Sequence, residues 1–430
     1  MKTVNAGILG IGNVGTGTYR TLQLNREKIL ESTGIDLRIT KILNRHPEKD
    51  RGIAIDKSVY VQDVDSIIKD PNIDIVVELI GGIEPATTYM AEAIKNGKHV
   101  VTANKAALAA NGEMLQKLAT ENHVMLRFEA SVGGGIPIIN ALTSALLSND
   151  FTEVLGILNG TTNYILTKMT DFQQKYADVL KEAQAKGFAE ADPTSDVEGI
   201  DVANKLSILM SLIFGVNVPP EEIPTQGITN INQVDIDYAN RFGCKIKLLA
   251  AAKKIGDKVE CDVQPALIDV NHPLASVNNE FNAIFVRGNA VDDIMFYGKG
   301  AGPLPTGSAV VGDMISIARN IDKDSAYDMK PLLRYDSDLE YVGEGVNQYY
   351  VRLSVDDRPG ILGNISSTLG RYGIGIESMM QSIQSRNEDE SVPLVFIFYE
   401  TSREVLDEAL QEITNRSFVK SVDSVIRVQK

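Results

Sequence analysis

Short apolar segments alternate with longer amphipathic segments over the first third of the chain. Continuous apolar runs of about four to eight residues are typical of buried strands, whereas apolar residues at every third or fourth position are typical of helices. The expected strands lie at residues 4–9, 37–43, 73–79, 99–102 and 124–129, and the expected helices at residues 14–30, 64–69, 85–96 and 105–121. Strands that alternate with helices predict a doubly wound parallel sheet of the α/β class.

The pattern changes at residues 131–137, where three consecutive glycines interrupt it. Such a run cannot continue a regular helix or strand, so we predict a domain junction here. The following segment, residues 134–300, mixes helices with strands and predicts an α+β domain. Its expected helices are residues 138–147, 163–170, 177–186 and 197–214, and its expected strands are residues 151–158 and two or three more between residues 258 and 296.

The last part of the chain predicts a third compact module. Residues 300–307 are expected to form a loop and residues 308–320 a helix, and the segment 301–320 would complete the first domain, residues 1–133. Residues 321–348 are polar and irregular, which is typical of a linker. Residues 349–430 then show the order βαββαβ, which predicts a ferredoxin-like fold. The expected strands of this module are residues 349–355, 374–384, 393–400 and 418–427, and its expected helices are residues 361–372 and 402–414.

A glycine-rich loop follows the first expected strand and opens the first expected helix. Residues 10–15 read GIGNVG, which is the GxGxxG spacing of dinucleotide-binding loops. Glycines at these positions allow a tight turn, close approach of a pyrophosphate and packing of helix on strand, while the helix N-terminus supplies N–H donors. The expected cofactor contacts are Gly10, Gly12, Asn13, Val14 and Gly15. The alternative is a glycine turn that binds nothing, but the strand–loop–helix context favours a nicotinamide dinucleotide.

The second expected strand runs into Asn44, Arg45 and His46. An acidic residue at this place would bind the ribose 2′-hydroxyl of NAD, whereas an arginine accommodates the 2′-phosphate of NADP. No carboxylate is present here to repel that phosphate, and Arg45 could pair with it. The sequence therefore favours NADP(H) over NAD(H). The alternative is an arginine that is simply exposed in a loop.

An acidic run ends on a lysine in the second domain, at residues 187–205. A solvated acidic loop is the usual explanation of such a run. However, Asp201 and Lys205 are four residues apart on an expected helix, so they share one face, and that face continues through apolar Ile208 and Leu212. A charged pair on a buried stripe needs partners or a function. Catalysis and an ordinary helix salt bridge both remain open.

A second candidate lysine, Lys105, follows Thr102 at the carboxyl end of an expected strand. Ligands of open α/β sheets bind at that edge, so both residues are well placed for substrate or nicotinamide. The alternative is a surface lysine at a helix start, although a cation is disfavoured there.

Composition narrows the class of protein further. The chain has 430 residues and a formal charge of −15, which disfavours binding to the phosphate backbone of nucleic acids. Its longest apolar run, residues 206–218, is shorter than the ~20 residues that cross a bilayer, and no signal peptide is evident. The two cysteines, Cys244 and Cys261, are expected to be buried free thiols, and the four scattered histidines do not predict a zinc site. We therefore expect a cytoplasmic protein.

Several motifs together resemble one family over essentially the whole chain. They are GILGIGNVG (7–15), VVTANKAAL (100–108), FEASVGGGIPII (128–139), GILNGTTNYIL (156–166), GFAEADPTSDVEGIDVANKL (187–206) and GKGAGPLPTGSAVVGD (298–313). In this order they resemble homoserine dehydrogenase in the form that carries a C-terminal ACT domain. The resemblance implies NAD(P)-dependent interconversion of L-homoserine and L-aspartate 4-semialdehyde, in threonine and methionine biosynthesis.

The resemblance also implies roles for particular residues. It assigns proton handling and positioning to Lys205 and Lys105, and it does not decide which of them transfers the proton. It implies binding of the substrate ammonium group by Glu190 and Asp201, with support from Asp192 and Asp196. The further cofactor contacts that it implies are Gly187, Glu190 and Gly302. It implies a monovalent-cation site, for Na⁺ or K⁺, on the carbonyl oxygens of Glu129, Val132, Gly134 and Ile136.

The C-terminal module, by this resemblance, would sense an amino acid. Its strand-to-helix turn contains Asp357, Gly360, Ile361 and Leu362, and the family expectation is feedback inhibition by L-threonine. The alternative is a module that serves only subunit assembly, and ACT domains imply a homodimer or homotetramer. Two positions depart from the family pattern: Gly307 stands where alanine is expected, and Asp292 where glycine is expected.

Two other functions fit parts of the sequence. A non-catalytic amino-acid sensor on a dinucleotide-binding scaffold would bind the cofactor without turnover. An aspartate-semialdehyde dehydrogenase would need a cysteine nucleophile at the edge of the cofactor domain. Cys244 and Cys261 lie in the wrong domain for that chemistry.

Overall fold

The computed structural model describes residues 2–321, 331–335, 337–381 and 391–429. The chain forms two compact units. The first comprises residues 1–154, 204–222 and 281–339, and the second comprises residues 155–203, 223–280 and 340–430. The strand β7 (Phe151–Ile157) and the helix α9 (Ile200–Ile213) run from one unit into the other.

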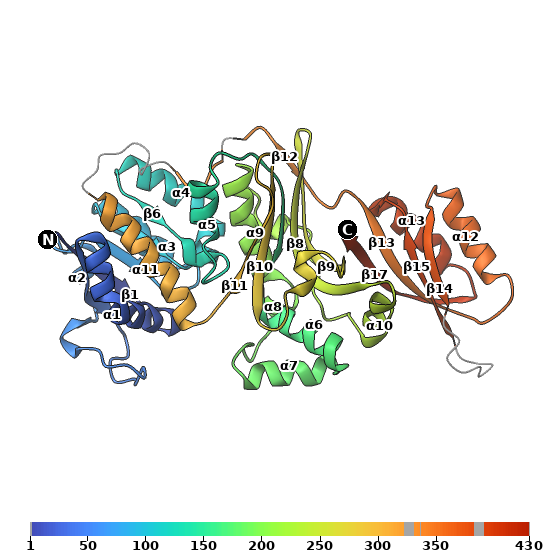
Figure 1. Ribbon diagram of the computed structural model, residues 1–430, viewed down its shortest axis with the longest axis horizontal. Helices are drawn as coiled ribbons and strands as arrows, with labels where there is room; N and C mark the ends of the chain where they lie inside the picture. Colours follow the sequence, from blue (N-terminus) through green and yellow to red (C-terminus); the bar gives the residue numbers. More distant parts are fainter. Residues whose placement is uncertain (1, 322–330, 336, 382–390, 430) are drawn as a thin grey trace. The chain divides into compact units, whose positions relative to one another are not determined.

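The first unit contains the predicted parallel sheet, with strand order β3-β2-β1-β4-β5-β6. Figure 1 labels two of its strands, β1 and β6. Its strands are β1 (Lys2–Leu9), β2 (Ile35–Leu43), β3 (Tyr60–Val61), β4 (Ile75–Glu78), β5 (His99–Thr102) and β6 (Leu126–Arg127). Its helices are α1 (Asn13–Thr33), α2 (Asp65–Ile68), α3 (Ala86–Lys95), α4 (Lys105–Glu121), α5 (Ile138–Asn140) and α11 (Pro303–Asn320), and β10 (Phe281–Gly288) pairs with β11 (Asp292–Lys299). The α/β, doubly wound class is therefore confirmed.

One face of this sheet is covered by α1 and α11, whose apolar side chains share a core with β1, β2 and β4. The two helices approach closely because glycines face each other. A Cβ atom on Gly307 of α11 would lie 2.5 Å from the carbonyl carbon of Gly17 on α1, too close for any side chain. This contact explains why glycine replaces the expected alanine at position 307.

The second unit is built on the strand order β8-β9-β17-β13-β15-β14. The strands are β8 (Cys244–Ile255), β9 (Lys258–Asp269), β13 (Val346–Val355), β14 (Ile376–Gln381), β15 (Val392–Phe398) and β17 (Val419–Gln429), with short strands β12 (Glu340–Val342) and β16 (Thr401–Ser402). The helices are α6 (Gly160–Phe172), α7 (Tyr176–Ala185), α8 (Thr194–Val197), α10 (Gln233–Arg241), α12 (Ile361–Arg371) and α13 (Arg403–Thr414).

The C-terminal module has the predicted ferredoxin-like order, with α12 and α13 packed against its antiparallel strands around one apolar core. Its sheet does not end at the module, because β17 pairs in parallel with β9. The expected domain boundaries at residues 133, 300 and 348 stay a prediction. Part of the expected linker and residues 382–384 of an expected strand lie outside the described residues.

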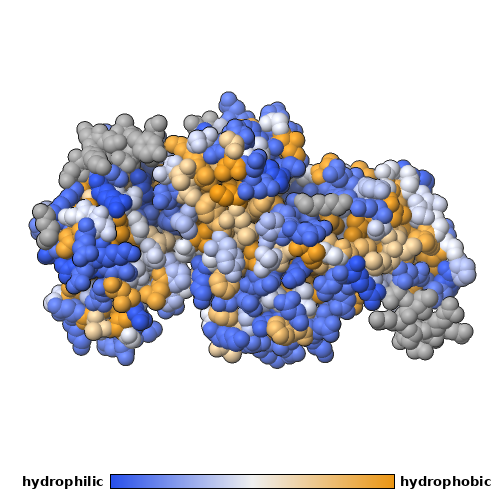
Figure 2. All heavy atoms as spheres, viewed as in Figure 1, coloured by the Kyte–Doolittle hydropathy of each residue, from blue (hydrophilic) through white to orange (hydrophobic). Residues whose placement is uncertain are grey.

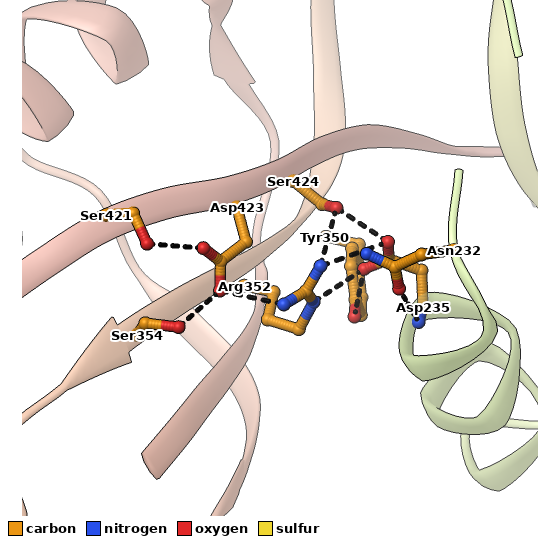
Figure 3. A network of polar contacts seen from close by, with 8 residues as sticks. All are labelled: Asn232, Asp235, Tyr350, Arg352, Ser354, Ser421, Asp423 and Ser424. Carbon is orange, nitrogen blue, oxygen red and sulfur yellow. Dashed lines mark hydrogen bonds and ion pairs between the residues drawn. The ribbon is translucent and has the colours of Figure 1, made fainter. Parts of the chain in front are cut away.

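A buried polar network joins α10 to this module (Figure 3). The carboxylate of Asp235 is fully buried and accepts hydrogen bonds from two nitrogens of Arg352 on β13, at 2.8 and 3.2 Å. Tyr350 and Ser424 donate to the same carboxylate, and Arg352 also donates to Asp423 at 2.7 Å. A bidentate pair with additional donors offsets the desolvation cost of a buried charge. The network therefore holds α10 against β13 and β17.

Three local predictions were only partly right. Residues 300–307 are not all loop, since α11 begins at Pro303, where a missing N–H costs nothing in the first turn. The expected strand 124–129 is shortened to β6, and the 3-10 turn Glu129–Ser131 follows it. The expected helix 138–147 is only a three-residue α5 followed by a π-helix, Ala141–Ala145.

None of the helices in the described residues is both long and apolar enough to cross a membrane. Figure 2 shows hydrophilic residues over most of the visible face, with hydrophobic areas between them.

Asp292, which stands where glycine is expected, adopts φ +54°, a left-handed conformation that aspartate tolerates better than most residues.

The α1–α11 contact yields a stability prediction. Gly307→Ala should lower the free energy of unfolding by about 1–3 kcal/mol, because the added methyl group overpacks the helix crossing. The matched change Gly312→Ala, on the same helix but with open space around it, should raise it by about 0.5–1 kcal/mol. Urea unfolding of both variants measures the difference, and equal effects would contradict this explanation.

Candidate active site

The glycine loop connects β1 to α1 with the geometry expected of a phosphate-binding turn. Gly10 has φ +97°, and a Cβ atom there would lie 2.9 Å from the carbonyl oxygen of Leu79. A Cβ atom on Gly15 would collide with the carbonyl oxygen of Gly10, whereas the space around Gly12 is open. Gly12 is also the N-cap of α1, whose first turn contains no acidic residue. The loop therefore leaves room for an anion at a helix N-terminus.

A cavity of about 340 Å³ lies beside this loop in the same unit. Gly12, Asn13 and Thr16 line it on one side, and basic side chains contribute to the rest. Its lining contains three basic residues, Arg20, Lys49 and Arg51, and one acidic residue, Asp50. A basic cavity at a dinucleotide loop is notable in a chain with formal charge −15.

Arg51 was missed by sequence reasoning. Its Nη2 donates to Oδ1 of Asn44 at 3.4 Å, and its Nε is buried without a hydrogen-bond partner among the described residues. Arg45, the predicted phosphate ligand, is exposed and does not line the cavity. The only sequence signal for Arg51 was its place in the polar segment after β2, which does not reveal how that segment folds back.

The carboxyl ends of β4 and β5 meet at Glu78 and Thr102. The fully buried Glu78 accepts a hydrogen bond from the Thr102 hydroxyl at 2.7 Å and another from the Ile80 amide at 2.7 Å. Asn104 caps α4 by accepting from the Ala107 amide, and Lys105 is the first residue of that helix. Thr102 and Lys105 thus lie at the sheet edge where ligands bind in such folds. Sequence reasoning missed Glu78.

Two acids of the predicted substrate site lie together in the second unit. Nδ2 of Asn159 donates to Oδ1 of Asp196 at 2.7 Å and to Oδ2 of Asp201 at 2.9 Å. The Thr161 hydroxyl lies 3.0 Å from the other oxygen of Asp196. The carboxylates of Asp196 and Asp201 therefore lie close to the N-terminus of α6.

Other predicted substrate residues lie apart from this cluster or differ in environment. Glu190 and Asp192 are exposed. Asp192 accepts hydrogen bonds from the backbone and hydroxyl of Thr194, which lower the pKa of its carboxyl and start the short helix α8. Asp201 and Lys205 of α9 are only 6% and 8% exposed, so the predicted burial of this charged pair is confirmed.

The three-glycine loop of the first unit surrounds a buried acid, Glu129. Its carboxylate accepts hydrogen bonds from the amides of Ile139 and Asn140, at 2.8 and 2.7 Å, and its amide donates to Asp313 at 2.8 Å. Burial raises the pKa of Glu129, and burial together with the Glu129 charge raises the pKa of Asp313 to about 8. Gly134, with φ +56°, packs directly against the backbone of Gly300.

In the described parts of the chain, no group of three or more His, Cys, Asp or Glu residues could hold a metal ion. Side chains alone therefore do not form a metal site there. The proposed cation ligands are backbone carbonyl oxygens, which such a grouping does not include.

Gly187 and Gly302 have positive φ values of +73° and +119°, and Gly302 caps α11. Their predicted contact with the cofactor stays a prediction.

The predicted regulatory turn leads into α12. Gly360 is the N-cap of this helix with φ +91°, and no described side chain caps it. Asp357 is exposed, Ile361 is buried and Leu362 is 37% exposed. Next to them, Asp356 forms ion pairs with Lys420 and Arg358, at 2.8 and 3.2 Å.

These features define a class of protein: an oxidoreductase that binds a nicotinamide dinucleotide and carries an ACT module. The family models for "Homoserine dehydrogenase, NAD binding domain", "Homoserine dehydrogenase" and "ACT domain" match residues 10–129, 137–315 and 349–417. The chain belongs to the homoserine dehydrogenase family, as its sequence resemblance predicts.

Individual relatives match all or most of the chain. The homoserine dehydrogenase of Bacillus subtilis is 39% identical, with 100% of this chain and 99% of the relative covered. The crystal structure of a homoserine dehydrogenase from Thiobacillus denitrificans has a TM-score of 0.93 and 38% identity, covering 100% of this chain and 99% of that one. A hyperthermophilic archaeal homoserine dehydrogenase in complex with NADPH has a TM-score of 0.61 and 28% identity, covering 74% of this chain and 98% of that one.

Proposed function

We propose that this chain interconverts L-aspartate 4-semialdehyde and L-homoserine with a preference for NADP(H). The observation that carries the proposal is the pair of Asp196 and Asp201 on the Asn159 amide, because an amino-acid substrate presents an ammonium group that such carboxylates attract. The proposal places the protein in the cytoplasm, in threonine and methionine biosynthesis.

The chemistry needs a proton as well as a hydride. When bound, the nicotinamide exchanges the hydride with the substrate carbon. Lys205 and Lys105 are the candidates for giving the proton to the carbonyl oxygen during reduction, and for taking it back during oxidation. Lys205 is only 8% exposed, so bulk water has little access to its amine. Asp201, with Glu190, would hold the ammonium group so that the reacting carbon is fixed in place.

The two competing functions have less support. Cys244 and Cys261 are both buried, and burial raises the pKa of the Cys261 thiol to about 12, so neither offers a thiolate for aspartate-semialdehyde dehydrogenase chemistry. A sensor without turnover would not need a buried lysine beside the acidic run.

Replacing Lys205 tests the catalytic assignment. Lys205→Ala should reduce kcat for homoserine oxidation by about 100-fold or more, because a positioned proton donor is lost. The Kd for NADPH should stay nearly unchanged. Steady-state rates and fluorescence titration measure the two quantities, with Lys181→Ala on exposed α7 as the control. Full activity in Lys205→Ala would remove this lysine from the mechanism.

The preference for NADP(H) is supported by the basic cavity beside Gly12. Arg51 has a buried Nε without a partner among the described residues, and Lys49 and Arg20 line the same space. The archaeal relative was crystallised with NADPH. A 2′-phosphate would provide the acceptors that these donors need.

Arg51→Ala should therefore raise the KM for NADPH by about tenfold, since a charge-assisted hydrogen bond is lost, and change the KM for NADH by less than twofold. Arg45→Ala is the matched comparison, because Arg45 is the predicted ligand but lies exposed. If Arg45→Ala selectively weakens NADPH and Arg51→Ala does not, the prediction from sequence is right and the assignment to Arg51 is wrong.

A monovalent cation is part of the proposal. The loop from Glu129 to Ile136 turns at Gly133 and Gly134, both with positive φ, which fits a loop that directs carbonyl oxygens inward. The Glu129 carboxylate is committed to the start of α5, so its contribution would be its carbonyl oxygen, with those of Val132, Gly134 and Ile136. Oxygen ligands suit Na⁺ or K⁺.

Regulation by L-threonine is also proposed. The uncapped N-terminus of α12 at Gly360 offers N–H donors for an amino-acid carboxylate.

Because β14 is the last strand of its sheet, it could pair with a second copy and give a homodimer or homotetramer.

Threonine should inhibit the full-length protein, and Gly360→Val should raise the half-inhibitory concentration at least about fivefold. Valine obstructs the anion site and strains a left-handed position. A point variant is preferable to removing the module, since β17 pairs with β9. The control Gly370→Ala lies in open space within the same helix. If threonine does not inhibit the wild-type protein, the proposed regulation is wrong and the module would serve subunit assembly.

A further inference from the structure

Asn159 lies at the junction of β7 and α6, and its side chain has two separate tasks. Its Oδ1 atom accepts a hydrogen bond from the Thr162 amide at 2.9 Å, which caps α6. Its Nδ2 atom faces the other way and donates to Asp196 and Asp201. The side chain is 5% exposed, so water cannot easily replace either set of hydrogen bonds.

The amide nitrogen brings together two carboxylates from different elements. Asp196 belongs to α8 and Asp201 to the first turn of α9. Since both accept from one nitrogen, at 2.7 and 2.9 Å, their bonded oxygens lie within about 5 Å of each other. The hydroxyl of Thr161, two residues after Asn159, lies 2.7 Å from the carbonyl oxygen of Phe188 and 3.0 Å from the second oxygen of Asp196.

Two carboxylates at this separation repel each other. This repulsion favours separation of the two carboxylates, or protonation of one of them with loss of its charge. Both outcomes would weaken attraction for an ammonium group. The Asn159 amide opposes both outcomes by giving each carboxylate one hydrogen bond, and the amide itself carries no positive charge.

We propose that Asn159 is a positioning residue that holds Asp196 and Asp201 as a pair for the substrate ammonium group. The assignment rests on the proposed function and deepens it. Asn159 itself need not touch substrate, since its amide hydrogens are already used on the two acids.

Capping and positioning can be separated, because a cap needs only the side-chain oxygen. Serine and aspartate cap helices about as well as asparagine. Asn159→Ser therefore keeps the cap and removes both amide hydrogens. Asn159→Asp also keeps the cap, but it adds a third carboxylate. Asn232→Ser is the matched control, because Asn232 caps α10 through its oxygen in the same way.

The experiment measures homoserine oxidation and, independently of turnover, homoserine binding by calorimetry in the presence of NADP⁺. Asn159→Ser should raise the KM and the Kd for homoserine at least tenfold, with the KM for NADP⁺ within twofold and the midpoint of thermal unfolding close to wild type. Asn159→Asp should in addition shift the acid limb of kcat/KM to higher pH, because a third carboxylate makes deprotonation harder. Asn232→Ser should change none of these quantities.

Three outcomes would overturn the proposal. The first is homoserine binding within twofold of wild type in Asn159→Ser, together with an unshifted acid limb in Asn159→Asp. The second is an equal loss of homoserine and NADP⁺ affinity with a lowered unfolding midpoint, which would make Asn159 a general structural residue. In both cases an active wild type leaves the proposed function intact. The third is a wild-type protein that binds no homoserine, which would overturn both proposals.

Discussion

Carboxylates that are removed from water must receive hydrogen bonds, and this constraint arranges most of the functional residues of the chain. Asp235 is bound by Arg352, Glu129 by the first amides of α5, and Glu78 by Thr102. Asp196 and Asp201 share Asn159. The donor to Asp235 is a cation, whereas the Asn159 amide is neutral. A neutral donor satisfies a carboxylate without adding a positive charge that would compete with an ammonium-bearing substrate.

Glycines let backbone segments of the first unit approach each other closely. Gly17 meets Gly307 where α1 crosses α11, and Gly134 meets Gly300 where the three-glycine loop reaches the start of that helix. Side chains at these positions would separate the elements. The glycines therefore bring α1, which follows the dinucleotide loop, and the proposed cation loop against the start of α11. They do so although α11 begins only at Pro303, far along the chain from the dinucleotide loop.

The C-terminal module is attached by backbone pairing and by a buried ion pair. The strand β17 continues the sheet through β9, and Arg352 joins the module to α10. Such attachments resist separation, because breaking one partner of a buried pair leaves an uncompensated charge. An effector bound at α12 would therefore act on a module whose sheet is continuous with that of the second unit.

The sequence by itself determined the parallel sheet, the glycine loop, the ferredoxin-like module and the burial of Asp201 and Lys205, because strand–helix alternation and helical spacing are local patterns. It made no prediction for β8, whose Ala- and Lys-rich segment has weak strand propensity and becomes a strand through pairing with β9. Only the tertiary structure decided that Arg51 rather than Arg45 lines the cavity and that Asn159 joins two acids. Such hydrogen bonds link residues about 40 positions apart, and no local spacing encodes them.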